Sequence, residues 1–510
     1  MKLIKNTKSI IRVSILVMVL FFVSNAFANI KLPAIFNDGM VLQQQSKAPM
    51  WGWAEPGEEV TVTGSWSAKS FSVIADASGK WRGMLQTPKA GGPYTLNING
   101  NNSLTLNDVL IGEVWVCSGQ SNMVFALKGS EGANAEIPLA DFSSIRYFNV
   151  KRQYGPHEFN DAQGSVWQKT NPQTAPSFSA VAYYFAKKIH KDLKVPVGIV
   201  YAAWGGTPAE AWTPGKVLQE DGSLHVYIKR WNEILQKVGK DSTAFHLAMD
   251  NWKKDSITQK KPTEPQTLYY YKRPWREPGV LFNGMINPVI PYAVKGVLWY
   301  QGESNVSYAD EYKHLFSSMI KSWRAKWNAD LPFYFVQLPP FGYSDLEAAA
   351  RLRKAQQEVA NKVLQTGMIA TIDLGNMKDI HPTRKKEVGE RLGMLALNKT
   401  YGLKDLIYSG PVFKKAVNQN GKVSVSFDQK LFTANNEKEG GFELGYKEAG
   451  SDSLLFVKAE SRMEGTEVIV WNAIIQNPVI IRYAWLQIGD ANLVNNTGLP
   501  ALPFSEEIKR

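Results

Sequence analysis

The middle of the chain alternates short, continuously apolar runs with segments of helical periodicity, and this alternation limits the possible folds most strongly. Between two of the runs, Tyr312, Leu315, Phe316, Met319 and Trp323 fall on one helical face. Strands that alternate with helices predict a parallel α/β sheet, with ligands bound at the carboxyl ends of its strands. The runs predicted to be strands are residues 114–117, 197–203, 297–300, 333–337 and 368–372.

Two further features refine this region. Ser344 and Glu347 have the spacing of a capping box, and they precede a helix predicted to continue through Val359. The strand–helix alternation is interrupted at about residues 213–278, where apolar spacing predicts two amphipathic helices. This insertion either shapes a substrate cleft or is a packing hairpin. The apolar positions are Trp231, Ile234, Leu235 and Val238 in the first helix, and Phe245, Ala248 and Trp252 in the second.

Short alternating runs separated by turn residues flank this central region on both sides. The runs at residues 60–63, 71–74 and 94–98 predict a small β-sandwich over residues 29–108. The pattern returns at 423–425, 454–457 and 468–470, which predicts a β-rich domain over residues 406–510. The central α/β domain then spans residues 109–405.

The first 28 residues have the pattern of a secretory signal peptide, which implies a secreted or periplasmic protein. An uncleaved membrane anchor is the alternative, but the apolar stretch is short for a span. The cations of this segment are Lys2, Lys5, Lys8 and Arg12; the apolar stretch covers residues 13–23, and small residues at 26 and 28 suit cleavage.

Composition and charge exclude several classes of protein. With 44% hydrophobic and 20% charged residues the chain is globular. Loss of the signal peptide lowers the formal charge from +12 to +8. The densest basic run, residues 384–386, is followed by Glu387 and Glu390. This mixture of charges predicts a solvated surface and no nucleic-acid site. The single cysteine, Cys117, excludes intramolecular disulfides and CxxC metal sites. The sequence shows no metal-ligand cluster and implies no cofactor.

Polar residues follow four of the predicted strands. After the first, a helix that begins near Asn122 would place Ser121 at its N-terminus, where free N–H groups favour a developing anion and suit a nucleophile. A plain helix cap is the alternative. The GxSxG elbow of α/β-hydrolases is absent, because Met123 stands at the second glycine position. A Cys117 nucleophile is a weaker alternative, since its apolar neighbours raise a thiol pKa.

The next two stretches offer hydrogen-bond donors. Gly205 and Gly206 either form an oxyanion hole or make an ordinary turn. The stretch that runs from Gln301 to Asn305 contributes amides and the Glu303 carboxylate, although Asn305 can instead cap a helix.

The last stretch, residues 379–382, contains the only histidine that follows a predicted strand and precedes a predicted helix. His381, with Asp379 nearby, is what a serine nucleophile requires for proton removal; a surface histidine is the alternative.

Together the four stretches resemble the four-block pattern of SGNH hydrolases, and within them the sialate O-acetylesterase family of carbohydrate esterases. The resemblance covers nearly the whole mature chain and implies an SGNH-type (flavodoxin-like) three-layer parallel sheet domain flanked by β-rich domains. Its further segments are residues 32–43, 112–115, 204–212, 281–286, 299–305, 379–392 and 491–504.

The resemblance implies Ser121 as nucleophile, His381 as general base, and an oxyanion hole formed by Ser121, Gly205 or Gly206, and Asn305. Many SGNH enzymes have an acid three residues before the histidine, where this chain has Lys378, so Asp379 is expected to orient His381, with Asp373 in reserve. Further substrate contacts are expected from Gln120, Trp204, Gln301 and Glu303.

The implied function is metal-independent removal of O-acetyl groups from sialic acid through an acyl-enzyme. Acetylxylan or another acetylated glycan is the alternative substrate, and a carbohydrate-binding protein that has lost catalysis is the alternative of another class. Four aromatic residues either stack on a sugar or belong to the core: Trp204, Trp212, Trp299 and Tyr300. The carboxylate of sialic acid requires a cation, for which Arg230, Arg273 and Arg276 are candidates.

Overall fold

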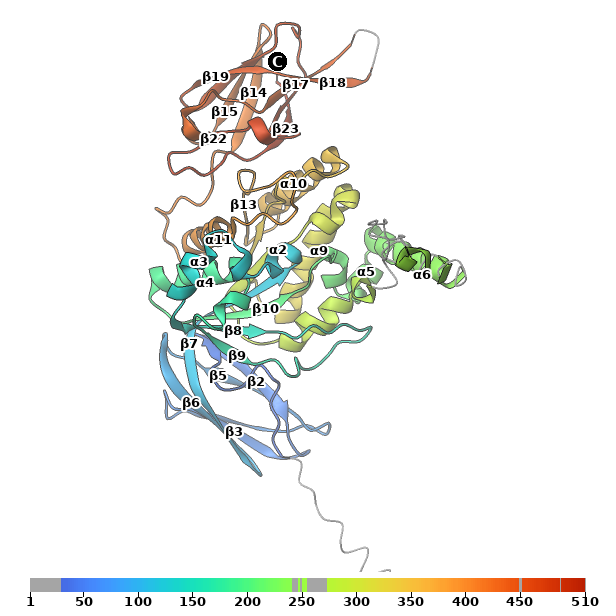
Figure 1. The fold of residues 1–510 in the computed structure, drawn as a ribbon. Coiled ribbons are helices and arrows are strands. Elements are labelled where there is room, and N and C mark those ends of the chain that lie inside the picture. Colours follow the sequence, from blue (N-terminus) through green and yellow to red (C-terminus); the bar gives the residue numbers. More distant parts are fainter. Residues whose placement is uncertain are drawn as a thin grey trace, which may run out of the picture.

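The structure is a computed structural model that describes residues 29–240, 246–247, 250–254, 273–448, 452–486 and 488–509. The predicted signal peptide, residues 1–28, lies outside the described residues, as do Phe245 and Ala248 of the second predicted insertion helix. Three units follow one another along the molecule, with a β-rich unit at each end and the α/β unit between them (Figure 1). None of the described helices is both long and apolar enough to cross a membrane.

The N-terminal unit consists of antiparallel strand pairs together with β1, which is parallel to β7, and one long strand joins the unit to the central sheet. β7 (Ser103–Gly119) pairs first with β6 and then enters the central sheet. The predicted domain boundary at residue 108 therefore falls inside a continuous strand. The other strands of this unit are β1 (Val41–Gln43), β2 (Lys47–Trp53), β3 (Glu59–Gly64), β4 (Ser70–Ile74), β5 (Lys80–Gln86) and β6 (Gly91–Asn99).

The central sheet has the strand order β13–β12–β11–β7–β10–β8–β9. All neighbouring pairs from β13 to β8 are parallel, and only β9 at the edge is antiparallel to its neighbour. Apart from β8 and β9, the order along the chain is 2-1-3-4-5. These strands are β8 (Phe142–Asn149), β9 (Trp167–Thr170), β10 (Val197–Ala203), β11 (Gly296–Tyr300), β12 (Phe333–Val336) and β13 (Thr366–Ile369).

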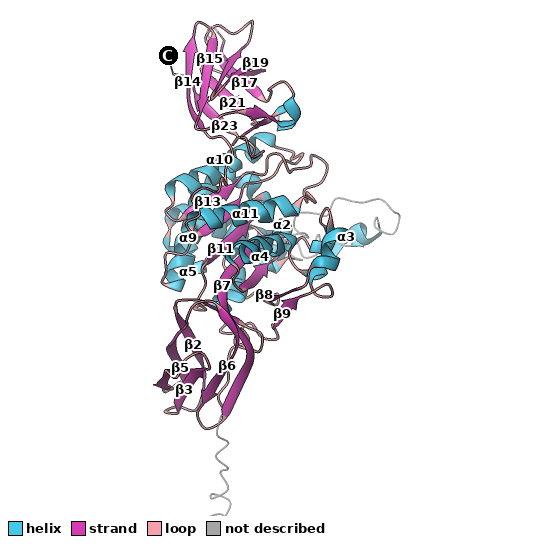
Figure 2. Ribbon diagram, turned by 90° about the vertical axis from the view of Figure 1, so that its left-hand side faces the viewer, coloured by secondary structure: helices cyan, strands magenta, loops and turns pink. Residues whose placement is uncertain are grey.

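Helices cover both faces of this sheet (Figure 2). Along β7, Trp115 and Cys117 belong to the apolar cluster that contains α4 (Ala180–Leu193) and α11 (Lys385–Lys399). Val114 and Val116 belong to the cluster that contains α9 (Ala309–Trp327) and α10 (Leu346–Lys362). Because successive strand residues face opposite ways, one continuous apolar run fills both interfaces.

The helices begin and end largely as their sequences predict. All five residues of the predicted apolar face of α9 are fully buried. The predicted capping box is wrong for α10, because the N-cap is Asp345, whose side chain accepts a hydrogen bond from Ala348 N at 2.8 Å. Glu347 instead binds Arg482 and Trp485 of the C-terminal unit.

The insertion contains α5 (Gly215–Glu220) and α6 (His225–Lys240), so its first predicted helix is confirmed. The C-terminal unit contains two four-stranded antiparallel sheets around an apolar core and a two-stranded sheet of β16 (Phe432–Thr433) and β22 (Leu493–Val494). One sheet consists of β14 (Phe413–Gln419), β15 (Lys422–Phe427), β20 (Glu467–Trp471) and β19 (Glu460–Glu464); the other consists of β18 (Leu454–Lys458), β17 (Phe442–Lys447), β21 (Ile480–Tyr483) and β23 (Phe504–Glu507).

Candidate active site

The carboxyl end of β7 positions Ser121 at the start of a short helix, α2 (Ser121–Val124). Gly119, the last residue of β7, has a φ of +137°, and a Cβ there would lie 2.2 Å from Tyr300 O. Only glycine therefore allows β7 to approach β11 this closely, and Gln120 N then donates to Tyr300 O at 3.0 Å. The predicted position of Ser121 at a helix N-terminus is confirmed.

The Gly205–Gly206 turn lies directly against this serine. A Cβ on Gly205 would be 3.4 Å from Ser121 Cβ. Thr207 Oγ1 donates to Trp204 O at 2.7 Å and so closes the turn. In the described part of the chain no protein group accepts a hydrogen bond from the N–H of Ser121, Gly205 or Gly206. The backbone N–H groups of Ser121 and of the adjoining Gly205 are thus available beside the serine, and that of Gly206 follows in the same turn.

Asn305 is fully buried, and its amide has a defined orientation. Its Oδ1 accepts hydrogen bonds from Ala209 N at 2.9 Å and from Gln301 Nε2 at 2.6 Å, and its Nδ2 donates to Glu210 Oε2 at 2.8 Å. Because a backbone N–H can only donate, the amide oxygen must face Ala209. One proton of Nδ2 is used by Glu210, and the second remains for another acceptor.

Sequence analysis did not identify Glu210. Burial raises the pKa of its carboxyl, and the hydrogen bond from Asn305 acts in the opposite direction. The sequence feature that could have identified Glu210 is its position six residues after Trp204, in the same loop as the paired glycines.

His381 lies in the loop after β13, beside Asp379. Asp379 Oδ1 accepts a hydrogen bond from His381 N at 2.9 Å and lies 3.8 Å from His381 Nδ1. No hydrogen bond joins the His381 ring to Ser121 among the described residues. Catalytic hydrogen bonds are often long or unformed before substrate binds, so the missing hydrogen bond leaves His381 a candidate partner of Ser121.

Asn122 connects the serine and histidine segments. Its Nδ2 donates to Ile380 O at 3.0 Å and to Glu303 Oε1, while Lys385 Nζ donates to its Oδ1 at 2.5 Å. Residues adjacent to Ser121 and to His381 are thereby in direct contact. The predicted sites at the ends of β7, β11 and β13 meet at this asparagine.

Lys385 corrects the expectation that residues 384–386 form a solvated surface. Its side chain is fully buried, and its Nζ lies 5.0 Å from the Phe125 ring and 5.1 Å from the Tyr300 ring. Burial lowers the pKa of Lys385 to about 7, which the Glu303 carboxylate partly opposes. Burial raises the pKa of Glu303, whose Oε2 is buried and has no hydrogen-bond partner among the described residues.

The side chains of Gln120 and Gln301 are buried, and they form hydrogen bonds with other groups of the protein. Gln120 Oε1 accepts a hydrogen bond from Ser304 N at 3.2 Å. Gln301 donates to Asn305 and accepts from Tyr312 Oη at 2.9 Å. These contacts position the β11 loop.

Three of the four aromatic residues expected near the site belong to the core. Trp212, Trp299 and Tyr300 are at most 1% exposed, so a stacking role for them is wrong. Trp204 is half-buried at the end of β10.

Two reserve assignments are also wrong. Asp373 is held by Arg391 through hydrogen bonds of 2.7 and 2.6 Å, so it does not orient His381. Cys117 is fully buried in β7, and burial raises its pKa, which excludes a reactive thiolate.

Two of the candidate arginines have protein partners. Arg230 pairs with Glu311 through both guanidinium arms. Arg276 is buried and donates to Gly206 O. Arg273 starts the short turn that carries Trp275 and Arg276.

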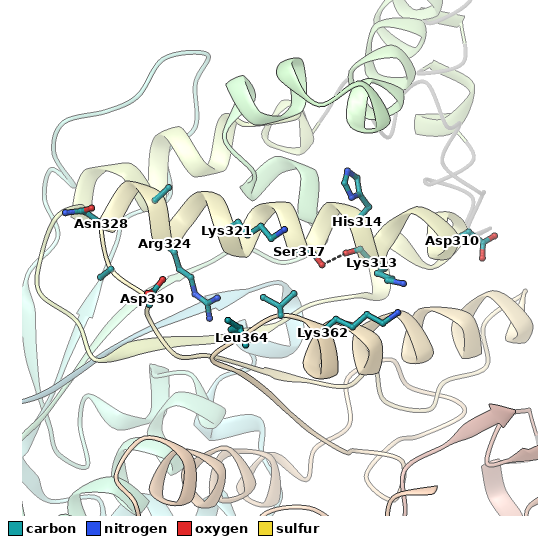
Figure 3. Close-up of a pocket in the computed structure, with 13 residues that line it drawn as sticks. Asp310, Lys313, His314, Ser317, Lys321, Arg324, Asn328, Asp330, Lys362 and Leu364 are labelled. Atoms are coloured by element: carbon teal, nitrogen blue, oxygen red, sulfur yellow. Dashed lines mark hydrogen bonds between the residues drawn. The ribbon is translucent and has the colours of Figure 1, made fainter. Parts of the chain in front are cut away.

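A hollow of about 1080 Å³ lies away from these residues, along α9 and the end of α10 (Figure 3). Its lining includes Lys313, Lys321, Arg324 and Lys362, but Lys313 pairs with Glu358 and Arg324 donates to Leu331 O at 2.9 Å. It contains none of the predicted site residues, so size alone does not identify the active site.

Comparison with known families agrees with this geometry. The model of the family described as "Carbohydrate esterase, sialic acid-specific acetylesterase" matches residues 111–245 and 270–398. The matched ranges include every residue of the candidate site from Ser121 to Lys385.

Individual proteins are similar over nearly the whole chain. The sialate O-acetylesterase of Mus musculus is 29% identical over 88% of this chain and 87% of its own length. That of Homo sapiens is 27% identical over 82% of this chain and 80% of its own. The crystal structure of a carbohydrate acetylesterase from Xanthomonas citri is 33% identical, with a TM-score of 0.79, and the match covers 94% of this chain and 99% of that one.

Proposed function

The chain belongs to the sialic acid-specific acetylesterase family of carbohydrate esterases, and on that premise we propose that it is a serine esterase that removes O-acetyl groups from sialic acid. The contact of Asn122 Nδ2 with Ile380 O, at 3.0 Å, carries the proposal, because it holds the Ser121 segment against the His381 segment. The strand order 2-1-3-4-5 supports an SGNH-type, flavodoxin-like fold.

The reaction proceeds in two acyl-transfer steps. Ser121 Oγ attacks the acetyl carbonyl carbon while the His381 ring takes the hydroxyl proton. Collapse of the tetrahedral intermediate breaks the ester bond, and the protonated His381 ring returns that proton to the departing sugar oxygen. Water then attacks the carbonyl carbon of the acetyl-serine while His381 takes one of its protons. The bond between Ser121 Oγ and the acetyl carbon breaks, His381 returns the proton to Ser121 Oγ, and acetate is released. Asp379 faces His381 Nδ1 and stabilises the charged ring.

The oxyanion of each intermediate is bound by donors that are in place before substrate arrives. They are the N–H of Ser121, that of Gly205 or Gly206, and the second proton of Asn305 Nδ2. Preorganised donors of this kind usually provide the largest share of catalysis in acyl transfer. Glu210 acts through Asn305, because its carboxyl holds the donor end of that amide.

A different acetylated glycan is the second candidate substrate. The Xanthomonas citri relative is described as a carbohydrate acetylesterase without reference to sialic acid. Acetate release from 9-O-acetylated sialic acid compared with acetylated xylan distinguishes the two substrate classes.

The cationic and apolar pattern of residues 1–28 supports secretion or export to the periplasm. Mass spectrometry of the exported protein tests this directly. We expect a mature chain that begins near residue 29, and an intact N-terminus on a membrane-bound chain would contradict export with cleavage.

Replacement of the nucleophile tests the esterase function. Ser121→Ala should remain folded, because Ser121 Oγ forms no hydrogen bond with the described protein, and it should release no acetate above the uncatalysed rate. Ser118→Ala is a control, because Ser118 is a buried serine in β7, three residues before Ser121. Acetate release by Ser121→Ala at the wild-type rate would disprove the mechanism. A well-folded wild type that binds acetylated glycan without hydrolysing it would indicate a binding protein.

A further inference from the structure

A segment that sequence analysis did not assign reaches the same edge of the sheet as the candidate site. β8 pairs in parallel with β10, and beyond the strands Val150 N still donates to Tyr201 O at 2.9 Å. Residues 151–155 therefore leave the sheet beside the loop that begins at Trp204. Both loops follow carboxyl ends of parallel strands, where ligands bind in such sheets.

Arg152, in this segment, lies over the half-buried Trp204. Its guanidinium carbon is 5.2 Å from the centre of the Trp204 ring. Trp275 stacks on Trp204 with ring centres 5.0 Å apart and an interplanar angle of 18°. The Tyr154 ring contacts both tryptophans edge-on. The aromatic cluster thus supports Arg152, and Trp275 and Arg152 both contact the Trp204 ring.

The position of Arg152 connects it to the reacting atoms. Trp204 immediately precedes Gly205, which lies against Ser121 Cβ. Trp275 immediately precedes Arg276, whose guanidinium donates to Gly206 O. The Trp204 ring that Arg152 covers and the Trp275 ring stacked on it are therefore both fixed to the candidate oxyanion loop.

Arg152 is exposed, and in the described part of the chain none of its N–H groups has a protein acceptor. Arg230 and Arg276, by contrast, are committed to Glu311 and to Gly206 O. Stacking on an aromatic ring uses the face of a guanidinium and leaves its in-plane donors free for a bidentate contact with a carboxylate.

We propose that Arg152 is a specificity-determining residue that binds the carboxylate of an acidic acetylated sugar at the rim of the active site. The inference rests on the proposed esterase function and adds the residue that distinguishes acidic from neutral substrates. Because the contact is remote from the acetyl group, it strengthens substrate binding without contributing to the chemical step.

The test compares 9-O-acetylated sialic acid with its methyl ester, which is the same sugar without the charge. Arg152→Ala should lower kcat/KM for the acid by about tenfold to a hundredfold through KM, as expected for a charge-assisted pair, and should leave the methyl ester unchanged. Arg152→Lys should recover part of the loss, because lysine keeps the charge without the bidentate geometry. Lys151→Ala removes the neighbouring exposed cation and should change neither substrate.

Binding provides a readout that needs no turnover. Calorimetry with the Ser121→Ala protein should show that addition of Arg152→Ala weakens binding of the acid by a similar factor and does not affect the methyl ester. Equal effects on acid and ester, or no effect on the acid in either assay, would overturn the role of Arg152. Absence of acetate release from both substrates by well-folded wild-type protein would instead disprove the esterase function, so the two failures are distinguishable.

Discussion

Removal of the Glu210 carboxyl should slow the chemical step through Asn305. The Asn305 amide has three protein contacts, and only the one to Glu210 fixes its donor end. In Glu210→Ala, Asn305 Oδ1 keeps its bonds to Ala209 N and Gln301 Nε2, so the side chain stays in place. Its Nδ2 loses the acceptor that directs the second proton toward the oxyanion.

The size of the effect follows from these contacts. A hydrogen bond to a charged group contributes about 1.5–3 kcal/mol, and each ~1.4 kcal/mol corresponds to a tenfold change in rate. Because two of the three contacts remain, we expect kcat for Glu210→Ala to fall about tenfold to a hundredfold with little change in KM. Loss of the whole donor in Asn305→Ala should cost about 10²- to 10³-fold and sets the upper limit.

Steady-state acetate release measures both variants, with thermal unfolding as a check on folding. Glu210→Gln offers a neutral acceptor of the same shape and should recover most of the activity. The double variant Glu210→Ala/Asn305→Ala should be no slower than Asn305→Ala within about threefold, because residues that act through one contact are not additive. Fully additive losses would refute the argument that Glu210 works through Asn305.

Three further expectations follow from the described contacts. Asp379→Asn should lower kcat about tenfold or more, because Asp379 faces His381 Nδ1. Asp373→Asn should lower the melting temperature with a smaller effect on kcat, because Asp373 pairs with Arg391. A large loss of kcat in Asp373→Asn and a large loss of melting temperature in Asp379→Asn would exchange their roles. Lys385→Met removes a lysine whose pKa burial lowers to about 7. The unfolded chain holds this proton more tightly than the folded chain. The free energy of unfolding of the wild type should therefore rise relative to that of the variant between about pH 7 and pH 10, by at most ~1.4 kcal/mol per pH unit. If urea unfolding gives the same difference in free energy between wild type and variant at pH 7 and pH 9, that would contradict the burial of the charge. Gly119→Ala should abolish activity and lower the melting temperature, because its Cβ would lie 2.2 Å from Tyr300 O, and a melting temperature equal to wild type would contradict that contact.

The α/β organisation could be predicted because buried parallel strands read as continuous apolar runs. Val197–Ala203 is buried at every position and was assigned from its sequence with the same bounds. The helical face of α9 was equally clear, because its buried residues recur every three or four positions.

β8 was missed because its pattern contains a charge at a buried position. Arg146 is 3% exposed, and Asp108, 38 residues earlier, neutralises it through two hydrogen bonds. A single sequence does not reveal such a distant partner. Since Arg152 lies in the loop after β8, the candidate for carboxylate recognition was missed as well.

Buried polar groups account for the other differences. Lys385 lies in a run of three cations whose composition favours solvent, yet Asn122 and two aromatic rings enclose it. Glu347 has the spacing of a capping residue, yet its carboxylate accepts a hydrogen bond from Arg482 of the C-terminal unit. In both places the partner comes from a distant part of the chain, which local patterns do not encode.

The most direct test of the central claim is covalent labelling by an organophosphonate, followed by mass mapping of the modified peptide. We expect one phosphonyl group per chain, attached to Ser121, and slow or absent labelling of His381→Ala, because the imidazole activates the hydroxyl. Failure of well-folded wild type to react, or reaction at a different serine, would contradict the account.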